Sequence, residues 1–77
     1  MGATNRIELD ALNRAIAVAG SQSELARKIG VSSTSVWRMV SRAQRMSAEF
    51  VLKAEAATGV SRHDLRPDLY PREDQAA

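Results

Sequence analysis

Apolar residues recur along this chain at intervals of three or four, the spacing of one face of an α-helix. The first stripe contains Leu9, Leu12, Ile16 and Ala19. No segment alternates apolar and polar residues with the period of two that is typical of a half-buried strand. The pattern therefore predicts an all-α fold.

Serines, one asparagine and glycines divide the pattern into five expected helices. A serine or asparagine at an N-cap accepts a hydrogen bond from a backbone N–H of the first turn, and glycine adopts the left-handed conformation that ends many helices. Proline cannot continue a helix. The expected helices begin at or just after Asn5, Ser21, Ser32, Ser47 and Ser61 and end near Gly20, Gly30, Ser41, Gly59 and Pro67, respectively.

Acidic residues follow three of these caps at the spacing of a capping box, in which a carboxylate binds the backbone N–H of the cap residue. They are Glu8, Glu24 and Asp64. Residues 42–45 are predicted to form a polar loop. We expect one domain over residues 1–71 and a flexible C-terminal tail over residues 72–77.

The composition narrows the class of protein. A chain of 77 residues suits one domain. It contains no cysteine, which excludes disulfides and thiolate zinc sites. No apolar run approaches the length of a membrane span, and the polar N-terminus lacks a signal-peptide core. We therefore expect a cytoplasmic protein that does not span a membrane.

Charge is unevenly distributed although the net charge is only +2. Residues 21–53 contain six basic and two acidic residues, a net charge of +4, whereas residues 54–77 carry −2. A concentrated basic surface is typical of proteins that bind polyanions. An ordinary solvated helix surface also explains such an excess.

The second and third expected helices carry the most specific signal. Only Gly30 and Val31 separate Ile29 from the cap Ser32, so the chain must turn sharply between two short helices. Ala26 is small enough for the helices to approach closely. Apolar residues fill the five positions where this pair must pack, namely Leu25, Ile29, Val31, Val36 and Met39. This pattern is typical of a DNA-binding helix-turn-helix, although a generic helical hairpin shares its packing.

Two segments resemble a known family. Residues 22–37 read QSELARKIGVSSTSVW and resemble the lambda-repressor-like Cro/cI family. Residues 55–71 read EAATGVSRHDLRPDLYP and resemble its YdaS-type Cro branch, found in prophages and beside toxin genes. The resemblance covers roughly residues 9–71 and implies a five-helix repressor fold, operator DNA binding and no cofactor. Arg42 stands where many cI-type members have a glycine.

In a helix-turn-helix the second helix of the motif enters the major groove. Here that helix is expected at residues 33–41. Arg38 is expected either to read a guanine bidentately or to bind a phosphate. Trp37 is expected to contact DNA or a partner, or else to fold over the following loop. The base-reading candidates are Ser33, Thr34, Trp37, Arg38 and Ser41.

A second set of residues is expected to bind phosphates. Gln22 and Ser23 open the second helix, where backbone N–H groups and the helix dipole favour an anion. The alternative for Gln22 is an ordinary first-turn residue that makes no DNA contact. The alternative for Arg27 and Lys28 is that they belong to a solvent-exposed helix face. The phosphate-contacting candidates are Gln22, Ser23, Arg42, Arg45, Arg27 and Lys28.

We also expect a homodimer on palindromic DNA, because repressors of this kind place two recognition helices about 34 Å apart. The apolar pair in the charged C-terminal region suggests an interface at Leu65, Leu69 and Tyr70. His63 has no ligand pattern around it and is expected on the surface.

The expected function is therefore a phage or prophage Cro-type repressor that binds operator DNA through residues 33–41. The first alternative is an antitoxin or other component of a toxin–antitoxin system that regulates its own operon. The second is a pure protein-interaction module that uses Trp37. No nucleophile–base pattern or phosphate loop is present, so we expect no enzymatic activity, cofactor or metal.

Overall fold

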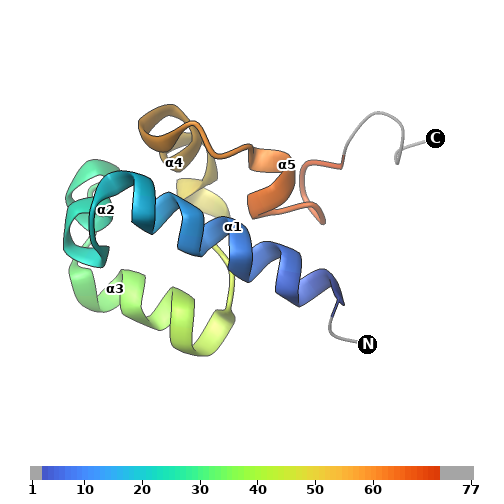
Figure 1. Cartoon of the computed structure of the whole chain (residues 1–77), viewed down its shortest axis with the longest axis horizontal. Helices are drawn as coiled ribbons and strands as arrows, with labels where there is room; N and C mark the ends of the chain where they lie inside the picture. The colour runs from blue at the N-terminus through green and yellow to red at the C-terminus, as the bar shows by residue number, and fades with distance from the viewer. Residues whose placement is uncertain (1–2, 72–77) are drawn as a thin grey trace.

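The computed structural model describes residues 3–71, which form five α-helices and no strand (Figure 1). The predicted all-α fold is confirmed, and the tail predicted at residues 72–77 lies outside the described residues. Among the described residues no helix has the length and apolarity needed to cross a membrane. The elements are α1 (Ala3–Ala19), α2 (Gln22–Ile29), α3 (Ser33–Arg38), the π-helix η1 (Met39–Ala43), the 3₁₀-helix η2 (Ala48–Phe50), α4 (Val51–Thr58) and α5 (Arg62–Leu65).

The long helix α1 packs against the other elements along most of its length. It contacts α2, α4 and α5, and α2 in turn contacts α3 and α4 (Figure 1). Five large side chains from four segments are fully buried between them: Leu12, Leu25, Ile29, Met46 and Leu65. Burying each such side chain stabilises the fold by about 1.5–3 kcal/mol relative to exposure. Val36 of α3 is buried in the same core, which therefore fixes α3 relative to α1.

The predicted turn between α2 and α3 is confirmed. The Ser21 hydroxyl accepts a hydrogen bond from the Glu24 N–H, which begins α2 at Gln22. Gly30 ends the helix with a φ of +83°, and its N–H donates to the Ala26 carbonyl. The Ser32 hydroxyl then accepts from the Ser35 N–H and begins α3. Two residues, Gly30 and Val31, therefore suffice to connect Ile29 at the end of α2 to the cap Ser32 of α3.

The three acidic residues predicted to complete capping boxes have other partners or positions in the structure. Because α1 begins at Ala3, Glu8 lies in the helix interior instead of the first turn, and its carboxylate is buried without a hydrogen bond. The Glu24 carboxylate pairs with Arg27 instead of reaching back. Asp64 pairs with Arg14 of α1 at 3.2 Å. The acidic residues of the second and fifth helices thus form ion pairs.

The predicted polar loop at 42–45 is wrong in its first half. The helical turns of α3 continue through Arg42 as η1, so no glycine is required there. The left-handed residue is Gln44, with a φ of +60°, and the Arg45 N–H donates to the Met39 carbonyl. The Ser47 side chain makes no capping hydrogen bond, and the 3₁₀ turn η2 precedes α4. The α3–α4 connection is therefore more helical than the sequence indicated.

The Arg66 guanidinium joins the segment after α5 to the α3–α4 connection, and we call this arrangement the clamp. The side chain of Arg66 donates to both Asp68 oxygens, at 2.9 and 2.8 Å, and to the Met46 carbonyl at 3.1 Å. The hydrogen bond from Arg66 lowers the pKa of Asp68 from 3.8 to about 2. The pKa of Arg66 is raised for the same reason. The residues after α5 are thereby held in place.

Candidate nucleic-acid interface

The outer face of α3 and η1 presents the five predicted base-reading residues to solvent. Val36 and Met39 are buried and set the rotation of this helix against α2. Half of the Trp37 surface is exposed (50%), so this side chain faces outward as predicted. The exposed set on this face is Ser33, Thr34, Trp37, Arg38 and Ser41.

Hydroxyl groups dominate the first turn of α3. The Ser32 hydroxyl is used within the helix as its cap. Ser33 and Thr34 are exposed, and a hydroxyl both donates and accepts hydrogen bonds. Ser41 donates to the Trp37 carbonyl at 2.8 Å, which leaves its oxygen as an acceptor. The face therefore presents hydroxyl groups that can either donate or accept hydrogen bonds, one indole and one guanidinium.

An open groove of about 360 Å³ runs between this helix and η2. Arg38 and Arg42 line it, together with Ser35, Ser47 and Phe50. The only acid on the groove wall is Glu49. Two guanidinium groups one helical turn apart are thus brought to one edge of α3.

The start of α2 offers a second site for an anion. Gln22 is half-buried and Ser23 is exposed in the first turn, where backbone N–H groups lack helical partners. At the other end of the helix Arg27 already pairs with Glu24, and Lys28 is exposed. Of the two bases on α2, Lys28 is therefore the one outside that ion pair.

Arg45 is placed apart from the other predicted phosphate contacts. Its guanidinium lies 3.6 Å from the buried Glu8 carboxylate and 3.8 Å from that of Asp68. Both carboxylates come from segments far away in the sequence, so the sequence pattern gave no sign of this arrangement. A phosphate that binds Arg45 must compete with both groups.

The predicted dimer residues have different surroundings. Leu65 is fully buried in the core of its own chain, so it is unavailable to a partner and its predicted role needs correction. Tyr70 is half-buried, and its ring lies 5.8 Å from the Arg62 guanidinium. The Tyr70 carbonyl is 2.7 Å from Nδ1 of His63, which lies in the first turn of α5 and is half-buried, less exposed than expected. Leu69 remains 45% exposed.

The sequence reasoning did not assign Ser35, Ser47 or Lys53 to the candidate interface. Ser35 lines the groove from α3 and Ser47 lines it from the segment between η1 and η2. The Lys53 ammonium lies 5.9 Å from the Phe50 ring centroid. Their spacing of three residues on a helical pattern was a usable signal for this contact.

The structure defines a small all-α protein with a helix-turn-helix and a basic groove beside its second helix. Comparison with known families gives a more particular assignment. A family model described as Bacterial toxin YdaS matches residues 12–74. The chain belongs to this YdaS family. No curated protein and no solved structure is detectably similar to it.

Proposed function

We propose that this protein is a sequence-specific DNA-binding transcriptional regulator, most simply a Cro-type prophage repressor, which binds operator DNA through α3 and η1. One observation carries the proposal. The helix that follows the two-residue turn buries Val36 and Met39 and exposes the complete set of candidate readers on its other face. A helix of this kind fits the major groove of B-DNA.

Each exposed group on this helix has a specific task in the proposed complex. Arg38 reads a guanine through O6 and N7, a contact worth about 1–3 kcal/mol of discrimination. Ser33, Thr34 and Ser41 form hydrogen bonds with base edges. Trp37 packs on apolar groups of the groove, which explains why an aromatic ring is left half exposed.

The remaining basic residues bind the DNA backbone and so set affinity and register. Arg42 lines the groove beside α3 and contacts a flanking phosphate. Gln22 and Ser23 offer the N-terminus of α2 to a second phosphate. Arg27 and Lys28 contribute long-range attraction. Arg45 binds a phosphate only if its ion pair with Glu8 or Asp68 breaks.

The single tryptophan provides a direct test. Trp37 emission is titrated with double-stranded operator fragments at about 0.15 M salt, where nonspecific binding is typically only ~10⁻⁴–10⁻⁶ M. We expect saturable quenching by DNA that contains the operator, and none at the same concentration of scrambled duplex. Unchanged emission with folded protein would contradict the placement of Trp37 at the DNA.

A second candidate function follows from the family description as a bacterial toxin. In this reading the protein belongs to a toxin–antitoxin system and binds a partner protein while it regulates its own operon. The exposed Leu69 and Trp37 are apolar contacts that a partner protein would use.

Growth after induced expression separates the two functions. The wild type is compared with Arg38→Ala and Arg42→Ala, which alter only exposed groups. A growth defect that disappears in both variants supports an effect through DNA. A defect that persists in both but disappears in Leu69→Glu, while that variant keeps the wild-type mass in solution, supports the partner-binding function.

A further inference from the structure

The exposed face of α1 is not used by the proposed DNA contacts. Ile7 and Val18 are 50% and 61% exposed, which places them among the most exposed large apolar side chains of the described residues. They are eleven residues apart, so they point within about 20° of each other on the helix and lie about 16 Å apart along its axis. Two exposed apolar side chains at the two ends of one helix face are available to a packing partner, and the residues between them decide which partner fits.

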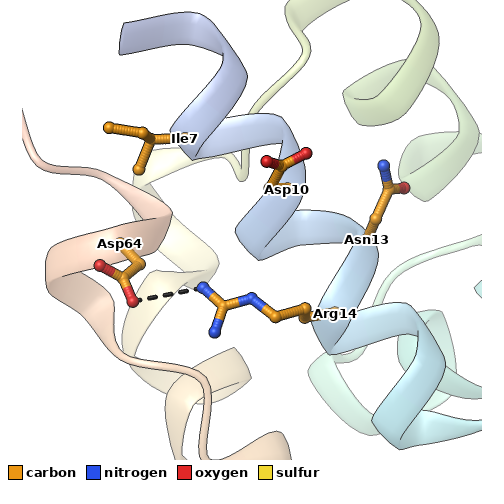
Figure 2. Close-up of a pocket in the computed structure, with 5 residues that line it drawn as sticks. All are labelled: Ile7, Asp10, Asn13, Arg14 and Asp64. Carbon is orange, nitrogen blue, oxygen red and sulfur yellow. Dashed lines mark hydrogen bonds and ion pairs between the residues drawn. The ribbon is translucent and has the colours of Figure 1, made fainter. Parts of the chain in front are cut away.

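Charged residues lie between these two apolar ends. Asp10 and Arg14 are exposed on the same side of α1 and line an open groove of about 520 Å³ between α1 and α5 (Figure 2). Ile7 and Asn13 line the same groove on α1, and Asp64 lines it from α5. Figure 2 shows Arg14 reaching across to Asp64, with Asp10 one helical turn away on α1.

We propose that this face of α1 is a homodimer interface, in which α1 of a second copy packs antiparallel against it. An antiparallel pair that sets Ile7 opposite the partner's Val18 brings Asp10 within one residue, about 1.5 Å, of a position opposite the partner's Arg14. The Arg14 guanidinium pairs with Asp64 of its own chain through one nitrogen, at 3.2 Å, and its remaining N–H groups cover that offset to the partner's Asp10. By the two-fold symmetry, every contact occurs twice.

The sequence of chemical types along α1 is therefore self-complementary. Reading from the N-terminus, the face is apolar, acidic, basic and apolar, at Ile7, Asp10, Arg14 and Val18. The same face turned end for end presents an apolar residue to each apolar residue and a base to each acid. This complementarity identifies a second copy as the occupant, because an unrelated partner has no reason to match both charges in this order.

The exposed Leu69 extends the surface at one end. Arg45 contacts both Glu8 of α1 and Asp68, so the segment after α5 lies beside the first turns of α1. The Leu69 side chain is 45% exposed there. One side chain cannot form an interface alone, because stable interfaces bury about 800 Å² per partner. The predicted interface thus shifts from Leu65, Leu69 and Tyr70 to α1, with Leu69 at its edge.

Sedimentation equilibrium of the full chain tests this interface without DNA. The wild type is expected at twice the 8.4 kDa subunit mass at high micromolar concentration. Asp10→Arg and Arg14→Asp each set like charges opposite each other across the two-fold axis. Each variant is expected to raise the dimer dissociation constant at least tenfold, with circular dichroism confirming that it is folded. Leu52→Glu changes an equally exposed residue on α4 (51%) and is the control that stays dimeric.

Mixing the two charge variants gives the decisive measurement. In a mixed pair each acid again meets a base, so an equimolar mixture is expected to recover the dimer mass that neither variant reaches alone. Two results would overturn the proposal: a wild type that remains monomeric throughout, or a mixture that stays as monomeric as its components. Because no DNA is present, either result leaves the proposed DNA-binding function to be judged separately.

Discussion

Arg38 and Arg42 lie one turn apart on the same groove, yet their surroundings indicate different roles. Arg38 belongs to the exposed face of α3 that holds Thr34 and Trp37. Arg42 lies in η1, close to the end of the helical segment, where the chain leaves the groove. The first turns of a recognition helix meet base edges, whereas residues beyond its C-terminal end flank the groove and meet phosphates.

Replacing Arg38 with alanine is therefore expected to relax base preference at one operator position. The variant should lose about 1–3 kcal/mol of binding free energy on DNA with the preferred base at that position, and much less on DNA with another base there. Binding is measured to a set of duplexes that differ at each position in turn. A uniform loss over all duplexes would assign Arg38 to a phosphate instead.

Replacing Arg42 with alanine is expected to weaken binding to all sequences alike. The slope of log K against log salt concentration should fall by about 1, because one phosphate contact is lost. Affinity is measured on the operator and on scrambled DNA over a range of salt concentrations. A change in sequence preference with an unchanged salt slope would contradict the role given to Arg42.

At the scale of elements, short-range chemistry made α2 and the start of α3 predictable. Ser21, Gly30 and Ser32 act within four residues of their own positions, so the sequence itself reports these boundaries. The π-helix η1 and the 3₁₀ turn η2 were not predictable in this way. They lie next to Met46, which is buried in the core and held through its carbonyl by Arg66, twenty residues further along.

The turn of the helix-turn-helix depends on the left-handed backbone of Gly30. A Cβ there meets no atom within 4 Å, so the cost of Gly30→Ala is strain in the backbone and not a clash. We expect a loss of about 1–2 kcal/mol in the free energy of unfolding. Urea unfolding measures it, with the exposed Lys28→Ala as a control expected to change within about 0.5 kcal/mol. Equal stability of both variants would mean that the turn tolerates another conformation.

At the scale of the whole molecule, ion pairs between distant segments complete the fold. Glu8 of α1, Arg45 after η1, and Arg66 and Asp68 after α5 meet at one place. None of these contacts follows from local spacing, which is why Glu8 was predicted as a cap and Arg45 as a free phosphate contact. The exposed face of α3 was predictable because helical periodicity alone separates it from Val36 and Met39.

The clamp at Asp68 gives the fold a specific pH dependence. Its pKa of about 2 lies below the ordinary 3.8, so the pairing stabilises the fold fully above about pH 4 and is lost as the pH falls to 2. Asp68 is 40% exposed, and solvent screening limits the effect to at most about 1 kcal/mol.

The Asp68→Asn variant tests this dependence. The difference in unfolding free energy between wild type and variant should shrink between pH 4 and pH 2, as measured by urea unfolding. Glu49→Gln, which removes a carboxylate outside the clamp, is the matched control. A difference for Asp68→Asn that stays constant over this range would show that the charge of Asp68 contributes nothing to stability.

The central claim is that this protein recognises a DNA sequence, and selection of bound fragments tests it most directly. Sheared host and prophage DNA is incubated with the folded protein at about 0.15 M salt, and the retained fragments are sequenced. The account predicts enrichment of a short palindrome whose half-site contains a guanine that becomes dispensable in Arg38→Ala. Retained fragments with no shared sequence, or no retained DNA at all, would contradict it.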